Sequence, residues 1–116
     1  MQRAATGTMV DPELNELRRE FLVEAQEKVR EMQTALDGDR SRDALNRLAY
    51  LAHQLKGSGG SYGYQGISSD AAELERAIES LTDGNPDQKL EEKIQQHVVS
   101  LRAEIDRRSR EVDGAN

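Results

Sequence analysis

The chain has 116 residues, a length typical of one domain with a single modest hydrophobic core. Its formal net charge of −6 comes from 22 acidic and 16 basic residues, which argues against a general nucleic-acid binder and against docking on anionic lipid. The absence of cysteine excludes disulfides and thiolate chemistry and fits a cytoplasmic protein. No apolar run approaches the length of a membrane span, and residues 1–8 lack the apolar region of a signal peptide.

The first predicted helix follows a short lead. Residues 1–10 are expected to be disordered. An acidic cap followed by a proline marks a helix start at Asp11 and Pro12. Apolar residues then recur at helical spacing, so residues 12–36 are expected to form one long helix or a short helix feeding a longer one. Gly38 breaks the pattern and ends this segment.

The second predicted helix begins after Asp39 or Ser41 and ends among glycines. Its apolar face comprises Leu45, Leu48, Ala52 and Leu55. Five glycines fall within ten residues, namely Gly57, Gly59, Gly60, Gly63 and Gly66. Because glycine permits both tight turns and a close approach of two helices, this cluster is expected to join the second helix to the third.

The last two predicted helices have regular apolar stripes. The stripe of the third helix is Ile67, Ala71, Leu74, Ile78 and Leu81. Residues 83–86 form a turn, and Asp87 is a candidate cap for the fourth helix. The stripe of that helix is Leu90, Ile94, Val98, Leu101 and Ile105. Residues 111–116 are expected to fray.

The fold class follows from these patterns. Each long helix is apolar on one face only, the connections are short, and aromatic residues make up only 3% of the chain. The expected fold is all-α, an antiparallel up-down four-helix bundle over residues 11–110. If residues 12–36 form two helices, the bundle has a short extra N-terminal helix.

Residues 51–60 carry the strongest chemical signal, around His53. This histidine lies about 130° from the centre of the apolar face of its helix, so it belongs on the outer surface. An imidazole titrates near neutral pH and has a nucleophilic nitrogen. Lys56 lies one turn later, where its ammonium can sit beside an anion on the imidazole. Gly57 adds no side-chain bulk, so another protein can approach closely. This set of residues favours a reversible phosphohistidine.

The same residues resemble a known signature. His-x-Leu-Lys-Gly-Ser from His53 to Ser58, followed by small residues and Tyr62-Gly63-Tyr64, is similar to the motif of histidine-containing phosphotransfer (Hpt) domains. The resemblance extends through Leu74-Glu75 and covers residues 13–106 when the flanking helices are included. It is also close to the phosphoacceptor domains of chemotaxis-type histidine kinases.

The resemblance implies a function and roles for three residues. His53 would be the phosphoacceptor, and Lys56 would stabilise the phosphoryl group. Glu75 would orient the imidazole, as the matching glutamate does in the chemotaxis-kinase branch. In an antiparallel pair, Glu75 also lies about as far beyond the glycine turn as His53 lies before it. The chain would be a cytoplasmic, bacterial phosphocarrier rather than an enzyme, with no ATP site.

The implied partners are response-regulator receiver domains and a histidine kinase, with no nucleic acid or membrane. The chain would act as a monomer and need no cofactor, since Mg²⁺ is expected on the receiver. The expected docking surface comprises Ala49, Tyr50, Gln54, Gly57 and Gly60.

Two other interpretations remain open. The chain can be a phosphoacceptor domain cut from a larger chemotaxis-type or hybrid kinase, or a helical adaptor in which His53 is incidental. A nucleotide-binding P-loop is disfavoured because Lys56 precedes the glycines and no strand is predicted. A bundle di-metal site is disfavoured because neither His53 nor His97 has a glutamate three residues earlier. His97 is expected at the surface or boundary of the last helix.

Overall fold

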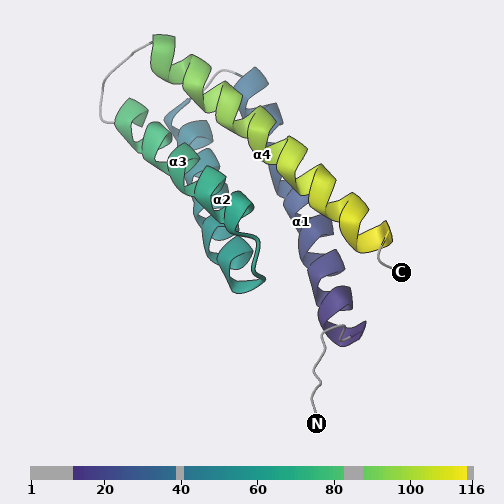
Figure 1. The fold of residues 1–116 in the computed structure, drawn as a ribbon. Helices are drawn as coiled ribbons and strands as arrows, with labels where there is room; N and C mark the ends of the chain where they lie inside the picture. The colour runs from purple at the N-terminus through teal and green to yellow at the C-terminus, as the bar shows by residue number, and fades with distance from the viewer. Residues whose placement is uncertain (1–11, 39–40, 83–87, 115–116) are drawn as a thin grey trace.

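The computed structural model describes residues 12–38, 41–82 and 88–114. They form four helices, α1 (Pro12–Asp37), α2 (Arg42–Ser61), α3 (Gln65–Thr82) and α4 (Gln88–Gly114). Helices α1 and α3 each contact both α2 and α4, and successive helices run in opposite directions (Figure 1). The predicted antiparallel four-helix bundle is confirmed. None of the helices in the described part of the chain is long and apolar enough to cross a membrane.

The core is built almost entirely from aliphatic side chains. Every side chain that the structure buries within the described ranges is hydrophobic. The predicted stripes supply most of it. Eleven of their positions are fully buried, namely Leu48, Ala52, Leu55, Ile67, Ala71, Leu74, Ile78, Ile94, Val98, Leu101 and Ile105. Leu45, Leu81 and Leu90 are only partly buried and pack against the edge of this core.

Helix α1 is one uninterrupted helix, which decides between the two alternatives for residues 12–36. Its N-terminal part extends past the α2–α3 turn (Figure 1). Leu17, which shares the apolar period, is therefore 47% exposed, whereas Phe21 one turn later is buried. The expected disordered lead, residues 1–10, lies outside the described residues.

Helix α2 begins after Ser41, one of the two predicted starts. The Ser41 hydroxyl accepts a hydrogen bond from the Ala44 N–H at 3.2 Å, which satisfies a backbone donor of the first turn. The helix ends among the glycines, as predicted, and it continues through Gly57, Gly59 and Gly60 before it stops at Ser61. These three glycines therefore act inside a helix, and the chain turns only after them.

An aromatic cluster holds the α2–α3 turn against α1. Gly63 has a φ of +85°, a left-handed conformation that side chains disfavour. On either side of it, Tyr62 and Tyr64 stack on Phe21 with ring centroids 5.0 and 6.0 Å away. Arg18 donates from Nε to the Tyr62 carbonyl at 3.4 Å. Burial raises the pKa of the Tyr64 hydroxyl above its ordinary value. The turn is thus fixed in place by packing on α1.

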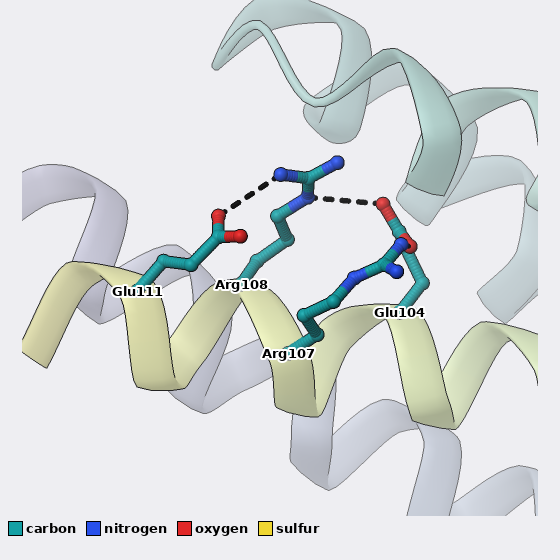
Figure 2. A network of polar contacts seen from close by, with 4 residues as sticks. All are labelled: Glu104, Arg107, Arg108 and Glu111. Atoms are coloured by element: carbon teal, nitrogen blue, oxygen red, sulfur yellow. Dashed lines mark hydrogen bonds and ion pairs between the residues drawn. The ribbon is translucent and has the colours of Figure 1, made fainter. Parts of the chain in front are cut away.

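Helix α4 packs closely against the start of α3. Glu104 on α4 is largely buried, pairs with Arg107, and accepts a hydrogen bond from Arg108 Nε at 3.0 Å (Figure 2). Its Oε2 lies 2.7 Å from where a Cβ on Gly66 would stand. Gly66 therefore leaves room for this carboxylate at the N-terminus of α3, where the helix dipole favours negative charge.

The end of α4 differs from expectation. Residues 111–116 are predicted to fray, but α4 remains helical to Gly114. Val112 packs against the core, Asp113 pairs with Arg19 of α1 at 3.3 Å, and Glu111 accepts from Arg108 at 2.9 Å. These contacts, which include the extended start of α1, keep the last turn ordered. The predicted turn at 83–86, the Asp87 cap and residues 115–116 lie outside the described residues.

Candidate functional site

The site is centred on His53, on the outer surface of α2. Its side chain is 64% exposed, while Ala52 and Leu55 on the same helix are buried. The imidazole Nδ1 lies 3.0 Å from Oε2 of Glu75. Within the described part of the chain, no hydrogen bond engages Nε2. The imidazole is therefore held through one nitrogen while its ring stays accessible.

Glu75 on α3 bridges the two basic groups of the site. Its Oε2 faces His53, and its Oε1 accepts from Lys56 Nζ at 2.8 Å. The side chain is only 16% exposed. The hydrogen bond from Lys56 lowers the pKa of the Glu75 carboxyl below its ordinary value, with a smaller contribution from His53 and against an opposing effect of burial. Glu75 is therefore ionised at neutral pH.

This ionised carboxylate decides the tautomer of a neutral His53. A carboxylate only accepts hydrogen bonds, so the imidazole nitrogen that faces it must donate. Nδ1 then carries the proton, and Nε2 keeps its lone pair. The arrangement presents a nucleophilic nitrogen on the exposed ring.

Lys56 is held against α3 and is not free on the surface. Its side chain is partly exposed, and its ammonium is engaged by Glu75. Its backbone carbonyl accepts a hydrogen bond from Ser68 Oγ at 2.8 Å. Sequence reasoning did not find Ser68, because the residue stands outside the histidine motif and becomes relevant only once the face between α2 and α3 is known.

The expected docking residues differ in their surroundings. Tyr50 is exposed, and its hydroxyl accepts from Gln54 Nε2 at 2.9 Å. Apart from the adjoining backbone of its own helix, nothing lies within 4 Å of where a Cβ on Gly57 would stand, so its surface is open. Gly60 faces Ser68, whose Oγ would be 3.5 Å from such a Cβ. Ala49 is partly buried and packs against the core.

A groove between α1 and α2 is lined mostly by charged side chains. Its lining includes Val23 of α1 together with Leu51 and Gln54 of α2. Val23 is 54% exposed, a large apolar side chain away from the stripe of its helix. An apolar residue outside the apolar face of its helix is a signal visible in the sequence. The sequence alone does not indicate which helix Val23 lies beside.

His97 is a boundary residue on α4, as expected. Its Nε2 lies 3.9 Å from Oε1 of Glu73, and its side chain is 20% exposed. On α3, burial raises the pKa of the Asp70 carboxyl, an effect that His97 opposes. No group of three or more histidine, cysteine, aspartate or glutamate side chains in residues 12–38, 41–82 and 88–114 is placed to hold a metal ion.

Comparison with known proteins agrees with the geometry. A family model described as the Hpt domain matches residues 16–111, which include parts of all four helices and the whole histidine motif. No curated protein and no solved structure matches the chain significantly. Hpt domains are phosphocarriers without an ATP site of their own, and they act in histidine phosphotransfer within phosphorelays. The chain belongs to the Hpt domain family.

Proposed function

We propose that the chain is a phosphocarrier of a two-component phosphorelay in which His53 is the phosphoacceptor. It accepts a phosphoryl group from a receiver aspartate or a kinase and passes it to another receiver aspartate. The observation that carries the proposal is the exposed imidazole whose Nδ1 lies 3.0 Å from the Glu75 carboxylate. A fixed tautomer on an accessible ring is useful to a nucleophile, whereas a histidine with only a structural role does not need one.

The chemistry requires little from the chain itself. The Nε2 lone pair attacks phosphorus in line, the bond between phosphorus and the aspartyl oxygen breaks, and the aspartate leaves as carboxylate. Positive charge develops on the imidazole and is stabilised through Nδ1–H by the carboxylate of Glu75. Phosphoryl transfer depends mainly on positioning and electrostatics, and the receiver supplies Mg²⁺. The carrier therefore needs no cofactor of its own.

Lys56 is proposed to stabilise phosphohistidine. A phosphoryl group brings about two negative charges to the site. The Lys56 ammonium lies one turn from His53 and already reaches the carboxylate that contacts the imidazole. It can then shift toward the phosphoryl oxygens with a small movement of its flexible stem. Because the site is exposed, salt will screen part of this stabilisation.

The proposed docking partner is a receiver domain, bound by the carrier as a cytoplasmic monomer. The surface consists of Tyr50, Gln54, Gly57 and Gly60, with Ala49 beneath it. Val23 extends it across the groove onto α1. A transient complex of this kind needs only an interface at the small end of the usual range.

A bulky residue at Gly57 should block this docking. Gly57→Leu places a side chain in open space, so the bundle stays folded, but the receiver can no longer approach His53. We expect transfer to fall at least tenfold, about 1.4 kcal/mol, with an unchanged circular dichroism spectrum. Ala103→Leu, an exposed site on α4, is the matched control and should transfer normally. Normal transfer by Gly57→Leu would remove Gly57 from the docking surface.

The phosphocarrier proposal is tested by transfer from a panel of receiver domains charged with a small-molecule phosphodonor. We expect acid-labile, base-stable phosphate on the wild type and on His97→Gln, but none on His53→Gln. Labelling only by an ATP-charged kinase domain would favour the alternative of a phosphoacceptor domain cut from a larger kinase. No labelling from either source would leave a helical adaptor as the better account.

A further inference from the structure

Lys56 is tied to α3 at both ends. Its ammonium donates to Glu75 Oε1 at 2.8 Å, and its backbone carbonyl accepts from Ser68 Oγ at 2.8 Å. Ser68 and Glu75 are seven residues apart, which is about two turns, so they lie on the same face of α3. One residue of α2 is thus bracketed by two polar side chains of α3, and it lies one turn from His53.

We propose that Ser68 is a positioning residue for His53. Its hydroxyl fixes how far α2 is displaced along α3, and this register holds Glu75 within hydrogen-bond distance of Nδ1. The expected effect of Ser68 on phosphoryl transfer rests on the proposed function of His53. Its expected effect on the orientation of the imidazole does not depend on that function.

The apolar seam between the two helices does not by itself fix this register. Burial of aliphatic side chains is non-directional and tolerates small displacements. A hydrogen bond is directional and weakens steeply as its geometry departs from the optimum. The contact between His53 and Glu75 spans 3.0 Å, so a slide of about one ångström would disrupt it. The hydrogen bond from Ser68 to the Lys56 carbonyl is such a directional contact, and it lies between the α2–α3 turn and the pair of His53 and Glu75.

The glycines of α2 make the Ser68 hydrogen bond possible. A Cβ on Gly59 would lie 3.2 Å from the Ser68 backbone nitrogen, so the two helices approach closely there. At Gly60, a Cβ would lie 3.5 Å from Ser68 Oγ, beside the path of the hydroxyl. With both side chains absent, the hydroxyl reaches the Lys56 carbonyl, which has a second lone pair for it besides the one used within the helix.

The test compares Ser68→Ala with Ser69→Ala. Ser69 is the next residue on α3 and is exposed, so this control makes the same chemical change outside the seam. The readout is the tautomer of His53, measured from the ¹⁵N chemical shifts of both imidazole nitrogens at a pH where the ring is neutral. We expect the wild type and Ser69→Ala to hold the proton on Nδ1. Ser68→Ala should shift a measurable part of the population to the Nε2–H tautomer.

A double-mutant cycle with Glu75 identifies the route of the effect. If Ser68 acts through Glu75, Ser68→Ala should slow transfer roughly two- to tenfold when it is introduced into the wild-type protein. Introduced into the Glu75→Ala variant, the same substitution should cause no further loss of transfer rate. Independent losses that multiply in the double variant would overturn the proposed route. An unchanged tautomer in Ser68→Ala would overturn the positioning role, even if the variant were less stable. The tautomer measurement keeps its meaning if His53 proves not to accept phosphate, so the two proposals fail separately.

Discussion

At the scale of single residues, the proposed role of His53 depends on its contact with the Glu75 carboxylate. An exposed imidazole on a helix is ordinarily free to exchange its proton between two nitrogens. Here Glu75 contacts Nδ1 at 3.0 Å and is itself held by Lys56 at 2.8 Å. The carboxylate is mostly shielded from solvent while the imidazole is exposed, so the site combines a fixed ring with an open approach.

The lowered pKa of Glu75 predicts a pH-dependent contribution to stability. A carboxyl whose pKa is lower in the folded than in the unfolded protein stabilises the fold fully above its unfolded value, here 4.5. That stabilisation declines below this pH and disappears as the pH falls through the folded value. The stabilisation lost in Glu75→Gln should therefore persist from neutral pH down to about 4.5 and shrink in stronger acid.

Urea denaturation over a pH series measures this difference. The matched variant is Lys56→Met, which removes the largest cause of the lowered pKa. Glu75→Gln is also introduced into the Lys56→Met protein. In that background, the change in unfolding free energy caused by Glu75→Gln should depend much less on pH in the acid range. A pH profile that is the same with and without Lys56 would contradict this account of the carboxylate.

At the scale of helices, α2 contains two glycines with opposite structural roles. Gly57 faces open space, whereas Gly59 is buried where α2 meets α3. A Cβ on Gly59 would stand 3.2 Å from Ile67 Cγ2 and 3.2 Å from the Ser68 backbone nitrogen. The Ile67 side chain can adjust, but the backbone nitrogen cannot move without displacing α3. The glycine is therefore required by the close approach of the two helices.

The same substitution at these two glycines should change stability in opposite directions. Gly57→Ala should raise the free energy of unfolding by about 0.5–1 kcal/mol, because alanine in a helix costs less backbone entropy. Gly59→Ala should lower it by about 1–3 kcal/mol, the usual cost of overpacking. Chemical denaturation of both variants checks this. A change of the same sign in both would show that the two sites do not differ in packing.

These contrasts show where prediction from the sequence succeeds. His53, Lys56 and Gly57 belong to one short motif on one helix, so local spacing is enough to bring them together. Placing Glu75 near His53 also requires an assumed pairing of two helices. Ser68 cannot be found in this way, because its role depends on the exact face that α3 presents to α2.

Helix ends are the less predictable part of the fold. The apolar stripes predict four helices, and these are confirmed. The end of α2 falls within the glycine cluster, as predicted, but the sequence does not say which glycines lie inside the helix. Glycine is compatible both with a turn and with a close helix contact, and spacing alone does not distinguish them. The order in the last turn of α4 escapes prediction, because its contact with Arg19 depends on a helix about ninety residues earlier in the chain.

At the scale of the whole molecule, the helices that carry the site pack on a single hydrophobic core. Helices α2 and α3 supply the polar residues of the site, while α1 and α4 complete the bundle (Figure 1). The buried side chains of all four helices form a single hydrophobic cluster. Unfolding is therefore expected to be cooperative, as in most small single domains.

A cavity in this core should lower stability without altering the chemistry of the site. Leu101→Ala on α4 removes a fully buried side chain and should cost about 2–5 kcal/mol of unfolding free energy. Leu17→Ala, at an exposed leucine of α1, should stay within about 0.5 kcal/mol. Thermal denaturation checks both, and transfer measured well below the melting temperature should be normal in each. Slow transfer by fully folded Leu101→Ala would show that the core also controls the site.

The central claim is that Glu75 holds Nδ1 so that Nε2 of His53 becomes phosphorylated. The most direct test is to label the protein with ¹⁵N-histidine, charge it from a phosphorylated receiver, and identify the phosphorylated nitrogen by NMR. We expect the phosphoryl group on Nε2 of His53, with Nδ1 still protonated. Phosphate on Nδ1, or on any residue other than His53, would contradict the account.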